Sequence, residues 1–224
     1  QTLAGWNHAD DVALVAPTVF QAVYREFARQ TFIDELGAEL CEEMLGSWYF
    51  WHERLALMVP ADVSAWFDDI RTPAIETRDD IFRRAALVAR SELEQSAGAD
   101  PGQWQWGRLH TLTFFSPLVP GKAPANVLGA GTHPKEGSGE TLNRASYKFG
   151  KPWDATSIAS LRFVADLADP DKVMAVLVGG ASGRQFDAHL KDQTPAWLSG
   201  EPRYWWFSDA AIAKHMQTEL VLQP

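Results

Sequence analysis

Leu161-Arg-Phe-Val-Ala-Asp-Leu-Ala-Asp-Pro-Asp-Lys-Val-Met-Ala-Val-Leu-Val178 is the stretch that decides the fold class. In residues 161–167 apolar side chains alternate with Arg162 and Asp166, which predicts a strand with one buried face. Residues 172–178 are nearly all apolar, which predicts a second strand covered on both faces. The Asp-Pro-Asp run between them is typical of a turn.

In the first hundred residues, apolar side chains recur at helical spacing instead. Pro17 fits a first helical position and is followed by apolar residues at helical intervals, and the aromatic segment 38–59 predicts a second helix ended by Pro60. A third helix begins at a Thr77–Asp80 capping box and stops at Gly98. Its predicted apolar stripe is Phe82, Ala86, Ala89 and Leu93.

Beyond residue 100 helices and strands are mixed. Residues 116–140 contain many Gly and Pro and predict a long ordered loop, and residues 187–199 predict a helix that Pro195 ends. Ser208 should cap a short helix, and Leu220-Val-Leu222 should form a final strand. With residues 1–100 mainly helical and 101–224 mixed, the predicted fold class is α+β, with strands mainly in the second half.

Composition excludes several functions. The chain has 224 residues and a net charge of −9, and its Lys and Arg are scattered, so nucleic acid binding is not expected. It contains no run of 18 apolar residues, so no membrane partner is expected. Cys41 is the single cysteine, and its apolar neighbours predict an inert thiol. Ten Trp, twelve Phe and four Tyr indicate a large aromatic core or an interface.

A search for self-contained chemistry finds none. Gly180-Ala-Ser-Gly183 lacks the second Gly of a nucleophile elbow, because Arg184 stands there, and is interpreted as a tight turn. Gly129-Ala-Gly131 lacks the third Gly of a dinucleotide loop. The six histidines show no metal-ligand spacing. The acids Asp166, Asp169 and Asp171 are compatible with calcium, but solvated turn acids are the favoured interpretation.

Three motifs carry a resemblance to a known family. They are Trp104-Gln-Trp-Gly-Arg-Leu-His110, Gly137-Ser-Gly-Glu-Thr-Leu-Asn143 with Ser160–Asp166, and His189-Leu-Lys-Asp-Gln193 with Trp197-Leu-Ser-Gly200. In this order they resemble the W-x-W-G-x-x-H motif, the glycine-rich turn with its following strand, and the C-terminal H-x-x-D-Q…W-x-x-G signature of the penicillin acylase (penicillin amidase) family.

The resemblance implies an N-terminal nucleophile hydrolase whose fold is an αββα sandwich. Residues 1–224 would be a single C-terminal segment of its β subunit. A precursor is processed autoproteolytically, and the new β N-terminal Ser attacks an amide with its own α-amine as base. Gln1 offers no such hydroxyl, so we expect no catalytic residue in this chain and a nucleophile supplied by another segment. Its partners would be the α subunit and the N-terminal part of the β subunit.

The same resemblance implies the substrate and the site. The substrate would be a small-molecule amide, such as an antibiotic β-lactam side chain or, in quorum quenching, an acyl-homoserine lactone. Thr141 and Asn143 match a short polar pair near the acyl pocket, although satisfying the turn backbone is an equally good interpretation of both residues. His110 and His189 are interpreted as packing residues. No cofactor is expected in this chain, since the family's calcium ion is bound upstream, and the location is periplasmic or secreted. A non-catalytic binding or scaffold domain of the same fold is the alternative.

Overall fold

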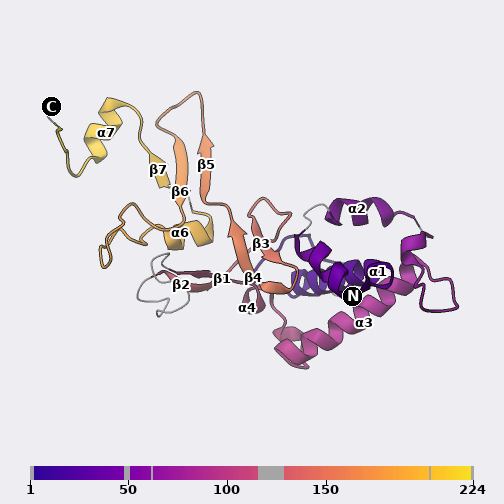
Figure 1. The fold of residues 1–224 in the computed structure, drawn as a ribbon. Helices are drawn as coiled ribbons and strands as arrows, with labels where there is room; N and C mark the ends of the chain where they lie inside the picture. Colours follow the sequence, from indigo (N-terminus) through magenta and orange to yellow (C-terminus); the bar gives the residue numbers. More distant parts are fainter. Residues whose placement is uncertain (1–2, 48–50, 62, 116–128, 202, 223–224) are drawn as a thin grey trace. The chain divides into compact units, whose positions relative to one another are not determined.

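The chain forms two compact units. In a computed structural model, which describes residues 3–47, 51–61, 63–115, 129–201 and 203–222, unit 1 comprises residues 1–113 and 132–158 (Figure 1). Unit 2 comprises residues 114–131 and 159–224. Helices dominate the first half of the chain and strands the second, so the predicted α+β class is confirmed.

Unit 1 is built on two long helices that pack along each other, α1 (Ala16–Ser47) and α3 (Arg78–Ala97). Helix α1 is interrupted at Gly37, whose φ of 75° is left-handed, and α2 (Trp51–Met58) follows. The prediction of a helix over 38–59 is therefore correct in kind but divided between two elements, with residues 48–50 outside the described residues. Three short helical turns, η1 (Ala65–Phe67), η2 (Pro101–Gln103) and α4 (Trp106–Leu109), complete the unit's helices among the described residues.

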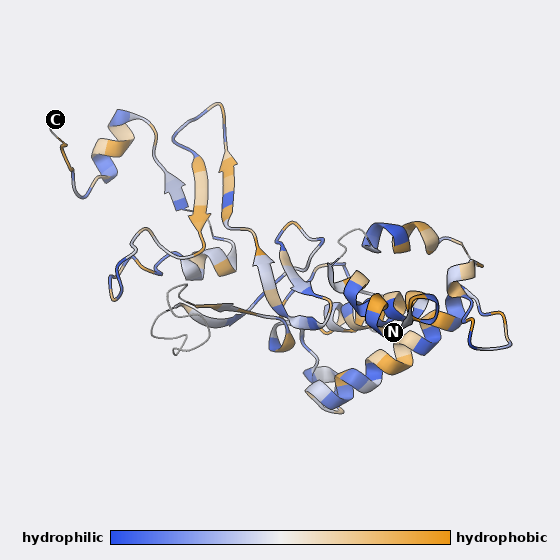
Figure 2. Ribbon diagram, viewed as in Figure 1, coloured by the Kyte–Doolittle hydropathy of each residue, from blue (hydrophilic) through white to orange (hydrophobic). Residues whose placement is uncertain are grey.

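Helix α3 begins and ends where the sequence predicts. The Thr77 side chain accepts from the Asp80 amide, Asp80 accepts from the Thr77 amide, and Gly98 caps the C-terminus. The predicted stripe is partly wrong, because Ile81, not Phe82, starts the buried row; the Phe82 side chain remains 47% exposed. The buried row is Ile81, Ala85, Ala89 and Leu93, spaced by four, and its two alanines allow α1 to approach closely. Figure 2 shows the alternation of apolar and polar residues along α3.

A four-stranded sheet completes unit 1, with strand order β2-β1-β4-β3. The strands are β1 (Thr111–Phe114), β2 (Gly131–Pro134), β3 (Ala145–Lys148) and β4 (Lys151–Ile158). Strand β1 runs parallel to β4, and β3 and β4 form an antiparallel hairpin. The prediction of a loop throughout 116–140 is wrong for β2, a short strand with little apolar pattern; residues 116–128 lie outside the described residues.

Unit 2 contains the predicted pair of strands. Strand β5 (Leu161–Ala165) pairs antiparallel with β6 (Val173–Leu177), and β6 pairs with β7 (Arg203–Trp205). The β6 prediction of full burial is only partly correct, since Ala175 and Val176 are buried and the other three residues are half-buried. Figure 2 shows β5 and β6 as two largely apolar strands.

Two further expectations for unit 2 are wrong. Pro195 starts helix α6 (Thr194–Ser199) rather than ending a longer one, because its fixed φ and missing N–H suit the first turn. Residues 220–222 are exposed and form no strand, since nothing within unit 2 pairs with them among the described residues. Ser208 caps α7 (Asp209–His215) as predicted, accepting from the Ala211 amide. None of the helices in the described part of the chain has the length and apolar character needed to span a bilayer.

Candidate functional site

The glycine-rich turn of residues 137–143 is a closed structure in unit 1. Gly137 has a φ of 81°, and a Cβ there would overlap the carbonyl oxygen of Asn143, so only Gly fits. The Ser138 amide donates to Thr141 Oγ1 at 2.8 Å, which closes the turn from within. Its backbone is tied to the N-terminal segment, because the Gly137 amide donates to the Asp10 carbonyl at 2.9 Å.

A buried lysine holds this turn in place. The Lys135 side chain is 1% exposed, and its Nζ donates to Asn143 Oδ1 at 2.8 Å and to the Glu136 carbonyl at 2.7 Å. Asn143 Nδ2 donates in turn to Glu136 Oε2 at 3.3 Å. Because a buried ammonium group is costly unless its hydrogens are bonded, these acceptors are what allow Lys135 to lie inside. Asn143 therefore serves the turn in this structure.

The W-x-W-G-x-x-H motif contacts and supports the same turn. Trp106 is fully buried, donates from Nε1 to the Gly137 carbonyl at 3.1 Å, and stacks on His110 with ring centroids 4.2 Å apart. The Lys135 amide donates to the His110 carbonyl at 3.0 Å. Burial, and secondly repulsion by Lys135, lowers the pKa of His110 to about 4. Backbone hydrogen bonds with Pro152 and Ala145 raise this pKa, but their effect is smaller. His110 is thus a neutral packing residue, as expected.

A cavity of about 620 Å³ lies beside this turn, entirely within unit 1, and we call it the aromatic cavity. Its size falls in the range of ligand and docking pockets. The N-terminal segment, α1, the start of α2 and residues 138–149 form its walls. The residues that line it include Trp6, Asp10, Phe20, Gln21, Tyr24, Trp51, His52, Glu53, Ser138, Glu140, Thr141, Arg144, Tyr147, Lys148 and Phe149.

One wall of the aromatic cavity is a continuous series of rings. Trp6 lies 5.4 Å from Phe20, Phe20 is stacked at 5.6 Å on Tyr24, Tyr24 lies 5.9 Å from Trp51, and Trp51 meets Phe149 edge-on at 5.8 Å. Each separation is within the range of favourable aromatic pairs. The rings come from four segments of the chain, namely the N-terminal segment, α1, α2 and residues 138–149, so the wall exists only in the folded unit.

The floor of the aromatic cavity is polar. Asp10 is only 7% exposed; burial raises its pKa, and a hydrogen bond with Ser138 opposes that shift. Beside it, Tyr147 Oη donates to Gln21 Oε1 at 2.7 Å. Burial likewise raises the pKa of the Tyr147 hydroxyl, which therefore stays protonated. The cavity consequently combines apolar walls with a single deeply placed carboxyl group.

The structure separates the two predicted site residues. Thr141 lines the aromatic cavity, whereas Asn143 is absent from its described lining and bonds to Lys135 and Glu136. Their assignment as substrate-binding residues stays a prediction. Sequence reasoning missed Asp10 and the aromatic wall. The one available signal was the high aromatic content, which does not say which rings meet.

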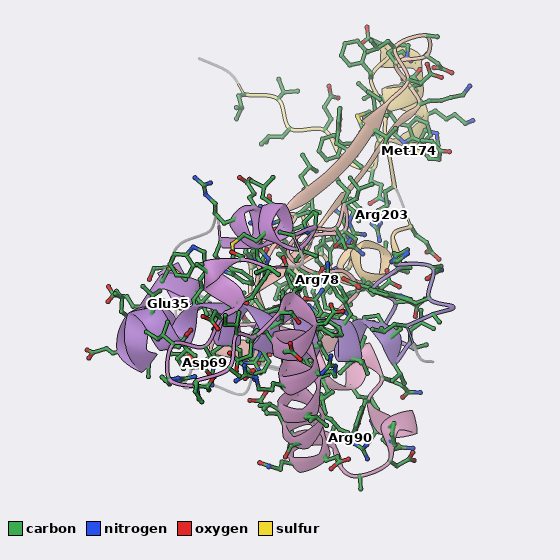
Figure 3. The ribbon with its side chains drawn as sticks, turned by 90° about the vertical axis from the view of Figure 1, so that its right-hand side faces the viewer. Glu35, Asp69, Arg78, Arg90, Met174 and Arg203 are labelled. Atoms are coloured by element: carbon green, nitrogen blue, oxygen red, sulfur yellow. The ribbon has the colours of Figure 1, made fainter. Side chains whose placement is uncertain are left out.

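The C-terminal signature forms a second ordered site, in unit 2. Asp192 Oδ2 contacts His189 Nδ1 at 3.2 Å and Arg203 at 3.3 Å, while Gln193 Oε1 accepts from the Leu177 amide of β6. Trp197 is fully buried, and the guanidinium of Arg162 lies 4.6 Å over its ring. These contacts fasten the signature to the sheet, and Figure 3 shows Arg203 and Met174 on its strands.

The tight-turn interpretation of Gly180–Gly183 fits this unit. A Cβ at Gly180 would overlap the His189 carbonyl, and Ser182 Oγ accepts from the Arg184 amide at 3.1 Å. In this geometry Ser182 has the role of a turn residue.

Acidic clusters in the chain have structural partners. Asp171 accepts from the Phe207 and Ser208 amides and from Ser208 Oγ, and Asp169 pairs with Lys172. Within the described residues no three His, Cys, Asp or Glu side chains are placed to hold a metal ion. Burial raises the pKa of the Cys41 thiol to about 11, in agreement with an inert cysteine.

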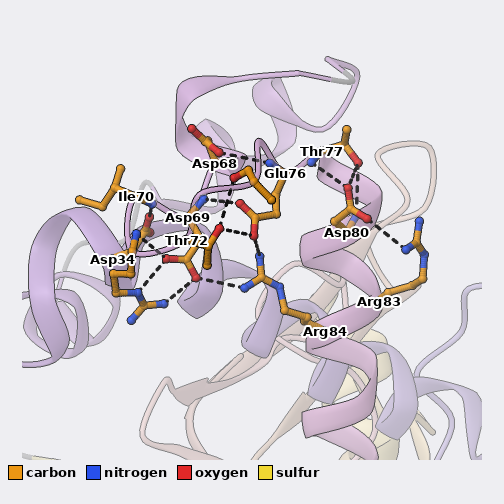
Figure 4. A network of polar contacts seen from close by, with 12 residues as sticks. Asp34, Asp68, Asp69, Ile70, Thr72, Glu76, Thr77, Asp80, Arg83 and Arg84 are labelled. Carbon is orange, nitrogen blue, oxygen red and sulfur yellow. Dashed lines mark hydrogen bonds and ion pairs between the residues drawn. The ribbon is translucent and has the colours of Figure 1, made fainter.

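A larger network joins the loop before α3 to both long helices (Figure 4). Asp69 accepts from Arg71 at 2.7 Å and from Arg84 at 3.0 Å, and Asp34 accepts from the Ile70 amide at 2.9 Å. The bonds from Arg71 hold the pKa of Asp69 well below its usual range. Glu35 lies in the same region (Figure 3), where burial and a hydrogen bond with Asp34 raise its pKa to about 7. We interpret this network as a structural tie that holds the loop against both helices, since Asp69 pairs with both Arg71 and Arg84.

Comparison with known proteins identifies the family. Residues 1–214 match the family model described as penicillin amidase. This chain belongs to the penicillin amidase family. Acyl-homoserine lactone acylase QuiP of Pseudomonas aeruginosa is 31% identical over 202 residues, covering 81% of this chain and 23% of that protein. The protein of the same name in Pseudomonas putida is 30% identical over 191 residues, with the same coverage.

The chain thus spans about a quarter of the length of the curated relatives that it matches. Its penicillin amidase motifs coincide with the structural sites described above: the tryptophan motif and the glycine-rich turn in unit 1, and the C-terminal signature in unit 2. Each site contains a fully buried tryptophan, Trp106 in the first and Trp197 in the second, which indicates that these motif residues support local architecture.

Proposed function

We propose that this chain is a C-terminal part of the β subunit of a penicillin amidase-type amidohydrolase. The match to the penicillin amidase model over residues 1–214 is the observation that carries the proposal. The enzyme hydrolyses the amide of an acylated small molecule, with an N-terminal Ser nucleophile supplied by another segment of the processed precursor. The two units of this chain contribute to an αββα sandwich, which the α subunit and the N-terminal part of the β subunit complete.

Within this enzyme the chain has a supporting role. The motif residues with reactive side chains, His110, Ser182 and His189, are engaged in ring stacking, a turn and a carboxylate pair. These contacts indicate that the three side chains stabilise the fold. Attack on a carbonyl would instead require a nucleophile and a base aimed at the same reacting atom. The buried Trp106 and Trp197 favour the same conclusion, since each anchors its unit.

Acyl-homoserine lactones are the substrate class that the relatives' names favour. Hydrolysis would release a fatty acid and homoserine lactone. A β-lactam side chain is the second substrate class, because the family model is that of penicillin amidase. We propose a periplasmic or secreted location for the processed enzyme.

The test uses the full-length precursor that encodes this chain. Expressed and purified, it should appear as two subunits, with a new Ser N-terminus on the larger one. It should hydrolyse an acyl-homoserine lactone, and the matched control is the same protein with that Ser replaced by Ala. A folded, processed protein that hydrolyses neither acyl-homoserine lactones nor a phenylacetyl anilide would contradict the proposal and favour a scaffold role.

A further inference from the structure

The charge of the aromatic cavity is concentrated at one point. Asp10 lies deep in the cavity, whereas the other acidic and basic lining residues are exposed. These exposed residues, Glu53, Glu140, Arg144 and Lys148, are two acids and two bases, so their charges cancel. Burial also lowers the pKa of His52, which favours its neutral form. Because burial disfavours the charged form of Asp10 and raises its pKa, a cation placed beside this carboxyl group would stabilise its ionised form.

The aromatic wall also favours a cation. Cations are attracted to the faces of Trp, Tyr and Phe rings within about 6 Å of the ring centre. Phe20, although 38% exposed, stacks on Tyr24 and extends the wall toward solvent. A flexible apolar stem that ends in a cation would cover these rings and reach Asp10, which is how Lys and Arg side chains bury their methylene groups.

We propose that the aromatic cavity is the docking site for a segment of the same acylase polypeptide outside residues 1–224, which inserts a Lys or Arg side chain toward Asp10. This inference rests on the proposed function, because it requires the remaining polypeptide. The matched relatives are more than four times as long as the region that this chain covers, since the match spans 23% of each. The docking segment places its apolar residues on the aromatic wall, which otherwise exposes Phe20 to water.

The first experiment is photo-crosslinking in the full-length, processed enzyme. Phe20 is replaced by p-benzoylphenylalanine, which keeps an aromatic ring on the wall. The expected product is a crosslink to a peptide outside residues 1–224 that contains a Lys or Arg within a few residues of the attachment point. Crosslinks confined to residues 1–224, no crosslink, or a crosslinked peptide without a basic residue would each overturn the inference. Leu87, exposed on α3, carries the same probe as the control for nonspecific crosslinking.

The second experiment identifies the charge pair. Asp10→Asn, Met in place of the crosslinked Lys or Arg, and the double variant are compared by urea unfolding of the processed enzyme. If the two groups form one buried pair, each single change lowers the folding equilibrium constant by at least about tenfold. The double variant is then no less stable than either single variant. Additive effects would overturn the pairing. Glu39→Gln, an exposed acid of α1 outside the cavity, should change the folding equilibrium less than about twofold.

A small cation serves as the third probe. Benzyltrimethylammonium should not bind the processed enzyme at the aromatic cavity, because the docked side chain occupies it. Saturable binding that Asp10→Asn removes would assign the cavity to a free ligand and overturn the inference. Amide hydrolysis is measured on the same samples: an active enzyme without the crosslink refutes the docking alone, and a crosslinked enzyme without activity refutes the proposed function alone.

Discussion

Replacement of Trp106 by Ala should destabilise unit 1 more than any exposed tryptophan replacement. The ring is fully buried, stacks on His110, and bonds to the carbonyl of Gly137 in the glycine-rich turn. Removing it leaves a void under the turn and an unbonded carbonyl within it. Both consequences fall on the same segment, which also forms one side of the aromatic cavity.

The magnitude follows from these two contacts. A buried Trp→Ala change typically costs about 3–5 kcal/mol of unfolding free energy. Loss of the partner of a buried carbonyl adds about 1–3 kcal/mol. The sum, roughly 4–8 kcal/mol, compares with about 5–15 kcal/mol for the total stability of a typical domain. Trp106→Ala should therefore unfold unit 1 in most conditions, or leave it marginally stable.

Urea unfolding of the processed enzyme, followed by far-ultraviolet circular dichroism, measures the effect. Trp106→Phe keeps the ring stacking and loses the hydrogen bond, so its cost should be less than half as large. Trp66→Ala is the matched control, because the Trp66 side chain is 40% exposed, and it should cost about 1 kcal/mol. A Trp106→Ala midpoint equal to that of Trp66→Ala would refute the assignment of Trp106 as the support of the turn.

Three other outcomes are expected. Asn143→Ala removes an acceptor of the buried Lys135 ammonium, and it should alter acyl-chain preference, measured as kcat/KM over an acyl series, more than it abolishes turnover; loss of activity with every substrate in a folded variant would contradict this. His110 has a pKa near 4 when folded and about 6.5 when unfolded, so the unfolded chain takes up the proton first, and unfolding free energy should fall by up to about 3 kcal/mol between pH 6.5 and pH 4. That fall should shrink in His110→Gln, and an unchanged pH profile would show that His110 is not its source. Residues 1–224 produced alone should aggregate and should not hydrolyse a phenylacetyl anilide, and a soluble monomer or measurable turnover would show otherwise.

Local chemistry made the ends of α3 predictable. Thr77, Asp80 and Gly98 act within one or two turns of their own positions, so their roles do not depend on distant parts of the chain. The buried face of α3 was harder to predict, because Ile81 and Phe82 are adjacent and both apolar. Ile81 is the residue buried in the core cluster with Phe27 of α1, whereas Phe82 meets the Phe27 ring edge-on and stays half exposed, and this packing is not encoded in the periodicity of α3 alone.

The candidate site was less predictable for a similar reason. Thr141 was named from its motif, but Asp10, Phe20 and Trp51 lie in segments that the sequence separates by up to 131 residues from Thr141, and no local pattern joins them. Pro195 shows the converse error. A proline signals a helix boundary, and only the hydrogen bonds of Gln193 and Thr194 to β6 and its end reveal that the helix starts there.

The exposed face of the unit 2 sheet links these findings to the proposed assembly. The register places Phe163 opposite Ala175 and Trp205 opposite Val173, so all four side chains share one face, and the rings of Phe163 and Trp205 meet at 6.2 Å. Yet Phe163 is 53% exposed, although alternation in the sequence predicted a buried face for its strand. The alternation correctly identified an apolar face, because pleating alone fixes which residues share it. In the proposed assembly another segment would cover that face, and burial of so apolar a surface is the free energy that would hold a second sheet layer against it.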